Sequence, residues 1–127
     1  MDTSAWYAII DKNDRDHPTA ITKMQNLDRP LVTSNYVLNE ILTLLKARLG
    51  PSVAIPFGQK LWNQEVASLV RITEKDEERA WGIFEQYEDK GFSFTDCTSF
   101  ALMERLEINT AFVFDDHFVQ YGKFVIL

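Results

Sequence analysis

The sequence predicts an α/β protein in which a parallel sheet packs between helices. Strand-like segments alternate with helix-like segments along the chain, which is the pattern of that fold class. The helix-like segments carry apolar residues at helical spacing, whereas residues 108–114 form a continuous apolar run that suits a strand covered on both faces. Short right-handed crossovers between such units produce parallel strands by default.

The first part of the chain is expected to form two helices and a strand. Residues 4–11 are predicted to be a short helix that runs into a polar loop. Pro18 suits the first turn of a second helix over residues 18–27, because its missing N–H would have no partner there in any case. Residues 31–33 are a candidate short strand after the break at Pro30.

The strongest helix prediction follows that strand. Ser34 is placed to cap a helix with apolar residues at helical spacing, and Gly50-Pro51 is a strong signal for its end. The next helical stretch contains Pro56 and Gly58, so its start is expected to be a kink or a loop.

The second half is expected to alternate strands and helices as well. Residues 69–73 are a candidate strand, and an amphipathic helix is predicted over residues 74–88. A further helix is expected over residues 96–106, and a last strand over residues 123–127. The predicted buried stripe of the first of these helices contains Ala80, Trp81, Phe84 and Tyr87.

Length, charge and cysteine content limit the possible functions. A chain of 127 residues with 46% hydrophobic residues predicts one domain over residues 1–127. The net charge of -6 opposes the broad basic face that grips duplex nucleic acid. The single Cys97 excludes an internal disulfide, and no apolar stretch approaches the roughly 18 residues of a membrane span. We therefore expect a soluble protein in the cytoplasm, without a membrane partner.

Acidic residues interrupt or end segments that otherwise look buried. Asp2 opens the chain, Glu40 lies within an apolar helix, Asp96 begins a helix, and Asp115-Asp116 follows the apolar run. A carboxylate that leaves water is costly unless a cation or several donors compensate it. A hard divalent cation with oxygen ligands would compensate several of them at once. Metal-dependent chemistry is the leading hypothesis.

Each acid also has an ordinary structural explanation. Taken alone, an acid at the edge of a helix, such as Glu40, is more often solvated or ion-paired than part of a site. An acid at a helix start, such as Asp96, is at least as often an ordinary N-terminal cap. Asp115 or Asp116 could be turn residues, and Asp2 could belong to a frayed terminus. The combination favours a site, because the predicted fold can bring these positions together beyond the carboxyl ends of the strands.

Other reactive side chains have weaker signals. His117 could be a catalytic base, but a single histidine in a turn is more often a surface or packing residue, and His17 has no stronger signal. Cys97 has no predicted base beside it, so a small buried thiol is the better interpretation. Lys12, Arg15, Lys46 and Arg48 are candidates for steering an anionic substrate.

The order and spacing of the acids closely resemble the PIN domain, specifically the VapC-type toxin ribonucleases. The resemblance runs over the whole chain and implies a three-layer α/β/α sandwich with a mainly parallel central sheet. It also implies a single-strand endoribonuclease that uses Mg²⁺ or Mn²⁺, a small antitoxin partner and a homodimer. The segments that carry it are Asp2-Thr3-Ser4-Ala5-Trp6-Tyr7-Ala8, Asn39-Glu40, Phe94-Thr95-Asp96-Cys97 and Phe114-Asp115-Asp116-His117-Phe118 with Gly122.

The resemblance also implies roles for individual residues. The catalytic acids would be Asp2, Glu40, Asp96 and Asp115, the metal ligands Asp2, Asp96 and Asp115, and the supporting residues Ser4, Thr95 and Asp116. Two positions depart from the family. Only Met1 precedes Asp2, where the family has a short apolar strand, so the strand is shortened or the true start lies upstream. Val113 replaces a Ser or Thr that the family often has.

Two other functions were weighed. A non-catalytic PIN-like module could use the acidic pocket to bind a partner, but the presence of all four acids argues against it. A receiver-like phosphotransfer domain would need a phosphoacceptor Asp and a late Lys after particular strands, and that pattern is not identifiable.

Overall fold

The computed structural model describes all residues from 1 to 127 and contains seven helices and four short strands. The helices are α1 (Thr3–Ile10), α2 (His17–Gln25), α3 (Asn35–Leu49), α4 (Pro51–Trp62), α5 (Glu74–Gln86), α6 (Phe94–Leu106) and α7 (His117–Tyr121). The strands are β1 (Val32–Ser34), β2 (Ser68–Val70), β3 (Thr110–Ala111) and β4 (Val125–Ile126).

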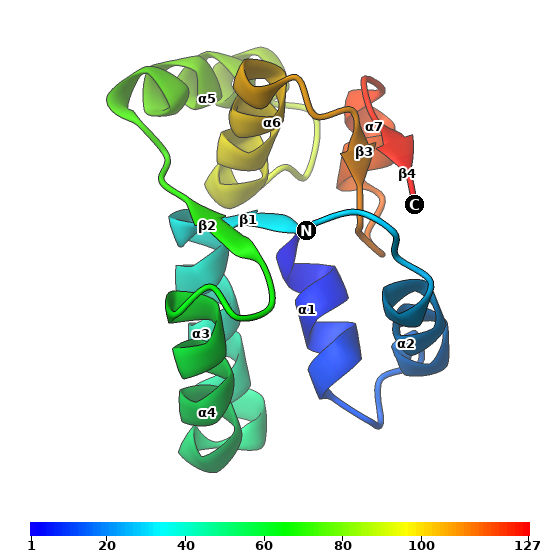
Figure 1. Cartoon of the computed structure of the whole chain (residues 1–127). Helices are drawn as coiled ribbons and strands as arrows, with labels where there is room; N and C mark the ends of the chain where they lie inside the picture. The colour runs from blue at the N-terminus through cyan, green and yellow to red at the C-terminus, as the bar shows by residue number, and fades with distance from the viewer.

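The strands lie between two groups of helices. Helices α1 to α4 are below them in the view of Figure 1, and α5, α6 and α7 are above. β1 pairs in parallel with β2, and β3 pairs in parallel with β4. The predicted fold class, a parallel α/β arrangement, is therefore confirmed.

Met1 and Asp2 connect the two strand pairs. The Met1 ammonium donates a hydrogen bond to the Val32 carbonyl (2.7 Å), at the edge of β1 that faces away from β2. The Asp2 amide donates to the Phe112 carbonyl (3.2 Å), directly after β3. These two residues therefore occupy the middle of the sheet, between β1 and β3.

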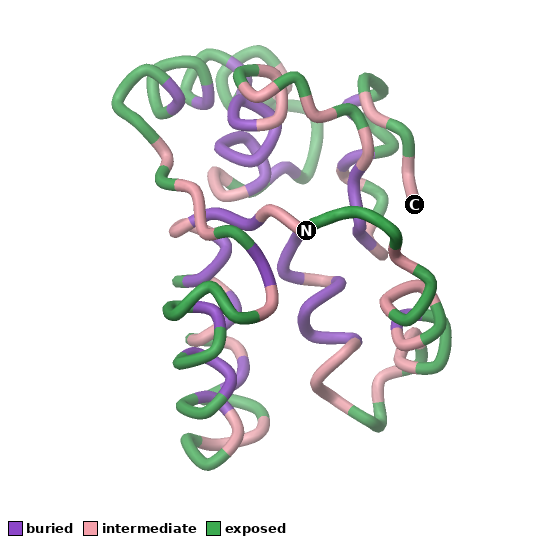
Figure 2. Tube along the Cα trace, viewed as in Figure 1, coloured by how far each residue is buried: buried purple, intermediate pink, exposed green.

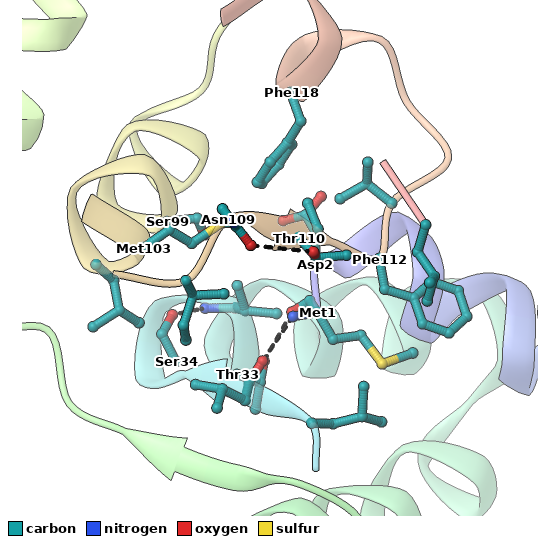
Figure 3. Close-up of a pocket in the computed structure, with 18 of the residues that line it drawn as sticks. Met1, Asp2, Thr33, Ser34, Ser99, Met103, Asn109, Thr110, Phe112 and Phe118 are labelled. Carbon is teal, nitrogen blue, oxygen red and sulfur yellow. Dashed lines mark hydrogen bonds between the residues drawn. The ribbon is translucent and has the colours of Figure 1, made fainter. Parts of the chain in front are cut away.

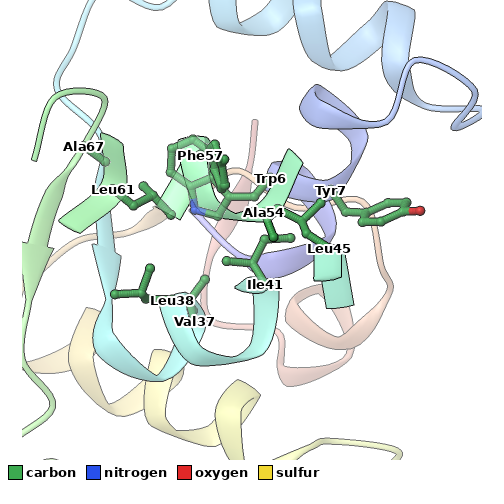
Figure 4. Packing of buried hydrophobic residues seen from close by; sticks show 10 residues of the cluster. All are labelled: Trp6, Tyr7, Val37, Leu38, Ile41, Leu45, Ala54, Phe57, Leu61 and Ala67. Atoms are coloured by element: carbon green, nitrogen blue, oxygen red, sulfur yellow. The ribbon is translucent and has the colours of Figure 1, made fainter. Parts of the chain in front are cut away.

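Each group of helices has its own hydrophobic core, as the buried segments in Figure 2 indicate. The first core joins α1, α3 and α4, and Figure 4 shows its side chains. In it, the Trp6 ring meets Phe57 edge-on at 5.5 Å, and its indole N–H donates to the Thr33 hydroxyl (3.3 Å). The second core is strongly aromatic, with Phe100 stacked on Tyr121 at 4.3 Å. Together the two cores fix the positions from which the acids project.

The first helix after β1 has the predicted ends. The Ser34 hydroxyl accepts a hydrogen bond from the Val37 amide (3.1 Å), which satisfies one of the free N–H groups of the first turn. Gly50 ends the helix with a φ of 87°, a left-handed value that glycine adopts without steric cost. The expected kink or loop at the start of the next helix is wrong, because α4 is helical from Pro51 onward and includes Pro56. Pro51 stands in the first turn, where a proline fits.

The buried stripe predicted for α5 is partly wrong. Ala80 is buried as expected, but Trp81 is 55% exposed and Phe84 is 40% exposed. The buried face instead contains Asp76, Ala80 and Ile83, which recur at helical spacing and face α6. The two aromatic rings lie beside this face, outside the core.

No helix combines the length and the apolar character that crossing a membrane would require.

Candidate metal centre

Three segments that are distant in sequence bring acidic side chains together. Asp2 immediately precedes α1, and Asp96 lies in the first turn of α6. Asp115 lies in the connection between β3 and α7. One possible ligand atom from each of Asp96, Asp115 and His117 lies within 4.8 Å of the others. The charges of Asp96 and Asp115 also act on Asp2, whose pKa they raise in addition to the effect of burial. Two of the four predicted acids, Asp96 and Asp115, therefore lie within ligand distance of each other, and Asp2 lies near enough for their charges to act on it.

Asp96 is held in place by the start of its own helix. Its Oδ2 accepts a hydrogen bond from the Ser93 amide (2.9 Å), and the Ser93 hydroxyl accepts one from the Asp96 amide (3.0 Å). This is a capping box in which Ser93, not Asp96, is the cap, so the interpretation of Asp96 as an ordinary cap is corrected. Burial raises the pKa of Asp96, and the nearby Asp115 raises it further, against the lowering effects of Ser93 and His117.

Asp2 is the least satisfied acid of the group. Its side chain is buried, and its Oδ1 is fully enclosed without a hydrogen-bond partner. Burial, followed by the charges of Asp96 and Asp115, raises the pKa of Asp2 to about 8. The adjacent Met1 ammonium is also taken out of water, which lowers its pKa to about 6. A buried carboxylate oxygen without a donor is expensive, and a cation placed there would compensate it.

Asp115 is half-buried and positioned by the turn that follows β3. Its Oδ1 accepts a hydrogen bond from the His117 amide (3.0 Å), which closes a local turn. The Ser4 hydroxyl accepts a hydrogen bond from the Phe114 amide (3.0 Å), so α1 holds the residue next to Asp115. Ser4 therefore contacts the backbone next to Asp115, and its supporting role stays a prediction.

Three other predicted residues have weaker structural links to the site. Thr95 is half-buried, and its carbonyl accepts a hydrogen bond from the Thr98 hydroxyl. Asp116 is exposed and stands before α7 without a side-chain capping hydrogen bond. Glu40 is half-buried on α3, forms no ion pair or hydrogen bond, and lies outside the group of ligand atoms around Asp96. Their roles stay predictions.

His117 lies beside Asp96 and Asp115, although its sequence context favoured a surface or packing residue. Its Nδ1 lies 2.6 Å from Asp96 Oδ2, and its ring meets Phe92 edge-on at 5.8 Å. Its position two residues after Asp115 was the available signal, since a turn of that length can return the side chain toward the acids. Only the contact with Asp96 in the structure shows that the His117 side chain turns back toward the acids.

The remaining candidates have structural surroundings. Cys97 is fully buried, as predicted, and burial raises its pKa to about 11, so the thiol is inert. His17 Nδ1 pairs with the Ala8 carbonyl at 2.7 Å. Arg48 lies over the Tyr7 ring, at the end of a helix that runs away from the strands. Lys46 is on the same distant part of that helix, so neither basic residue lies beside the acids.

Comparisons with known proteins identify relatives of this chain. The sequence pattern of the PIN domain matches residues 1–124. The 23S rRNA-specific endonuclease VapC20 of Mycobacterium tuberculosis, from strains CDC 1551 and H37Rv, is 34% identical over 122 residues, which cover 96% of this chain and 92% of VapC20. The crystal structure of M. tuberculosis VapC20, described as a sarcin–ricin loop cleaving toxin, superposes with a TM-score of 0.91 at 33% identity. That match covers 96% of this chain and 93% of the other.

Proposed function

This chain belongs to the PIN-domain family, and on that premise we propose that it is a metal-dependent endoribonuclease that cuts single-stranded RNA. We further propose that it is the toxin of a toxin–antitoxin pair, because its relative VapC20 is a toxin and an endonuclease. The observation that carries the proposal is the buried, unpartnered Oδ1 of Asp2 beside the charges of Asp96 and Asp115. Acids placed close together raise one another's pKa, and a bound cation would offset their repulsion.

The proposed metal ligands are Asp2, Asp96 and Asp115, and the proposed cation is Mg²⁺ or Mn²⁺. The donor set fits such an ion, because carboxylate oxygens are the ligands that hard divalent cations prefer. A bound cation would supply charge stabilisation at the phosphate and would lower the pKa of a coordinated water. His117 is available as a further ligand, or as the donor that fixes Asp96.

The chain's own residues supply orientation. Ser93 and His117 both contact Oδ2 of Asp96, which leaves Oδ1 without a protein donor. Ser4 fixes the backbone next to Asp115 through the Phe114 amide. We propose that Glu40 completes the catalytic acids, because its half-buried carboxylate takes part in no ion pair and no hydrogen bond within the protein. Thr95 and Asp116 are proposed to support the site.

Exposed apolar side chains support the proposed protein partners. Ile55 and Trp62 are both 60% exposed on α4, and Trp81 and Phe84 are exposed on α5. Such residues are enriched where proteins associate, which favours a homodimer and a docked antitoxin. The net charge of -6 would attract a basic antitoxin segment to the acids. We propose that the reaction takes place in the cytoplasm, because the proposed substrate is RNA.

The proposed activity is tested by incubating the protein with a mixed RNA pool that includes a sarcin–ricin loop oligonucleotide. We expect cleavage with Mg²⁺ or Mn²⁺ and none with EDTA. Asp115→Asn should lose cleavage, because the amide lacks the charge that holds the cation. The matched control is Asp28→Asn, which changes an exposed acid to which no role in the site is assigned and should keep the activity. Cleavage that persists in EDTA contradicts the metal-dependent mechanism, and no cleavage with either metal favours the non-catalytic module.

The proposed partners are tested separately. Light scattering at tens of micromolar should give the mass of a dimer, and a monomer would remove that part of the proposal. Co-expression with the adjacent open reading frame should relieve growth inhibition and yield a co-purified small protein. Unchanged inhibition without a co-purified protein contradicts the antitoxin proposal.

A further inference from the structure

The two oxygens of the Asp96 carboxylate have different surroundings. Oδ2 accepts a hydrogen bond from the Ser93 amide (2.9 Å) and lies 2.6 Å from Nδ1 of His117, whereas no group of the protein donates to Oδ1. Each carboxylate oxygen has about two lone-pair sites, so these two contacts occupy Oδ2. Oδ1 is therefore the oxygen of Asp96 that remains available to a cation.

The contact between His117 and Asp96 has the geometry of a hydrogen bond. An ionised carboxylate can only accept, so the ring nitrogen beside it must be the donor. Two ligand atoms at right angles around Mg²⁺ would stand about 3 Å apart, because each bond is about 2.1 Å long. The observed 2.6 Å is shorter than that separation, and a protonated Nδ1 has no lone pair to offer a cation.

Contacts on several sides hold the His117 ring in this orientation. The ring meets Phe92 edge-on at 5.8 Å. Gly91 lies beside Nε2, since a Cβ on Gly91 would stand 3.6 Å from that nitrogen. The His117 amide donates to Oδ1 of Asp115 (3.0 Å), which fixes the backbone. The direction of Nδ1 is therefore set by contacts to the ring and to the main chain.

The neighbouring Phe118 anchors the start of α7. Its side chain is 2% exposed and meets Phe100 edge-on at 4.8 Å. Figure 3 shows its ring pointing from α7 into a pocket whose lining includes Asp2. Consecutive side chains leave a helix about 100° apart, so the buried Phe118 also fixes the direction in which His117 leaves α7.

We infer that His117 is a positioning residue, which together with Ser93 makes Asp96 a one-oxygen ligand that binds the cation through Oδ1. The inference deepens the proposed metal centre and rests on it. His117 itself does not bind the cation. With Ser93 as the only donor, Oδ2 would keep a free lone pair, and Asp96 would lose its fixed orientation. Groups that orient a ligand in this way typically change metal affinity by about 10–100-fold.

The experiment separates a donor from a ligand with two substitutions of His117. His117→Leu removes the donor but keeps an apolar side chain beside Phe92. His117→Asn keeps a donor, because its amide nitrogen is bonded to Cγ as Nδ1 is. The matched control is His17→Leu, which changes the other histidine, whose Nδ1 pairs with the Ala8 carbonyl.

Calorimetric titration with Mn²⁺ gives the first measurement. We expect His117→Leu to bind at least about tenfold more weakly than the unchanged protein. His117→Asn should recover most of the lost affinity, and His17→Leu should lose none. Far-UV circular dichroism checks that each variant is folded. If His117→Leu does not fold, His117→Gln replaces it, because its amide nitrogen stands one bond farther out and does not match Nδ1.

Hydrogen exchange of the Ser93 amide in EDTA gives a second measurement that needs no metal. This amide donates to the same Oδ2, so a less restrained carboxylate should expose it. We expect exchange to be faster by at least about threefold in His117→Leu and nearly unchanged in His117→Asn. No Mn²⁺ binding by the unchanged protein would remove the proposed metal centre, whereas Ser93 exchange would still decide whether His117 orients Asp96.

Two results would overturn the inference. Equal loss of Mn²⁺ affinity in His117→Leu and His117→Asn, with Ser93 exchange unchanged in both, would make His117 a ligand. Undiminished Mn²⁺ affinity and unchanged Ser93 exchange in folded His117→Leu would reduce its role to packing against Phe92.

Discussion

Asp76 and Asp96 occupy the same position of the same local motif, yet their surroundings differ in charge. Each is the third residue of its helix and closes a capping box, with Thr73 in α5 and with Ser93 in α6. Each is almost fully buried, at 3% and 4% exposure. Capping and burial therefore do not distinguish them.

Their partners distinguish them. Arg105 donates from Nε to Asp76 Oδ1 (2.8 Å) and from its terminal nitrogen to Asp76 Oδ2 (2.9 Å). Burial opposes ionisation of Asp76, but these bonds and the capping bonds hold its pKa below the usual value. Asp96 has no arginine partner of this kind, and burial, together with a smaller effect of the Asp115 charge, raises its pKa. The same capping box therefore binds an arginine in one place and, in our proposal, presents a metal ligand in the other.

The largest expected effect is on catalysis. Asp96→Asn should keep the capping box, because an amide oxygen still accepts from Ser93, but it removes the charge that holds the cation. We expect RNA cleavage to fall at least about 100-fold while the far-UV circular dichroism spectrum is unchanged. Asp76→Asn is the matched control and should retain the turnover of the unchanged protein, once corrected for the folded fraction. Near-normal cleavage by folded Asp96→Asn would remove this residue from the proposed site.

The second prediction concerns stability, for which Asp76→Asn should have the larger effect of the two substitutions. Asp76→Asn leaves Arg105 without its carboxylate, so the free energy of unfolding should decrease by about 1–2 kcal/mol. The expected loss is small because the Arg105 side chain is 38% exposed, so solvent screens the ion pair. Asp96→Asn should not decrease stability without metal. Urea unfolding in EDTA measures both variants, and an equal loss for the two would contradict the comparison.

The third prediction concerns pH. Because its pKa is lowered, Asp76 contributes stability above its unfolded pKa, near 3.8, and that contribution is lost as pH falls through the folded value. Asp96 has a raised pKa, so its contribution is present below 3.8 and is lost as pH rises through the folded value.

Differences between variants isolate these two acids. In EDTA, the stability advantage of the unchanged protein over Asp76→Asn should shrink below about pH 4. The advantage of Asp96→Asn over the unchanged protein should be present at neutral pH and shrink as pH falls toward 4. Thermal unfolding from pH 3 to 7 measures both variants. The stability of the variant minus that of the unchanged protein should fall with rising pH for Asp76→Asn and rise for Asp96→Asn, and slopes of the same sign for these two differences would be inconsistent with opposite pKa shifts.

The smallest effects distinguish Asp2 from Glu40. Asp2→Asn relieves a buried, unpartnered carboxylate and should raise the melting temperature in EDTA by a few degrees. Glu40→Gln should raise it less, because Glu40 is half-buried, whereas Asp2 is buried and is acted on by the charges of Asp96 and Asp115. With Mn²⁺ present, both variants should gain less stability than the unchanged protein. Differential scanning fluorimetry is sufficient, and no dependence on metal would count against Asp2 as a ligand.

Much of the fold could be predicted from the sequence because local signals determined it. Ser34 and Gly50 bound α3 as expected, since capping and glycine conformation act within a few residues. The exposure of Trp81 could not be predicted, because neighbouring helical positions differ only in which one the partner helix covers. The role of Met1 and Asp2 in the middle of the sheet was also inaccessible, because it depends on hydrogen bonds to β1 and to the end of β3.

The candidate site was predictable to a similar extent. Asp2, Asp96 and Asp115 stand where segments begin or end, and parallel strands bring such positions to one edge. His117 was not assigned, because its contact with Asp96 joins two segments that no local pattern connects. Glu40 was predicted from the family resemblance, and its role stays a prediction.

The most direct test of the metal centre is calorimetric titration of Mn²⁺ into the unchanged protein, Asp96→Asn and Asp76→Asn at neutral pH. If the acids around Asp96 form the site, the unchanged protein and Asp76→Asn should bind with the same affinity. Asp96→Asn should bind at least about tenfold more weakly. Equal binding by all three proteins, or an equal loss in the two variants, would contradict a cation site built on Asp96.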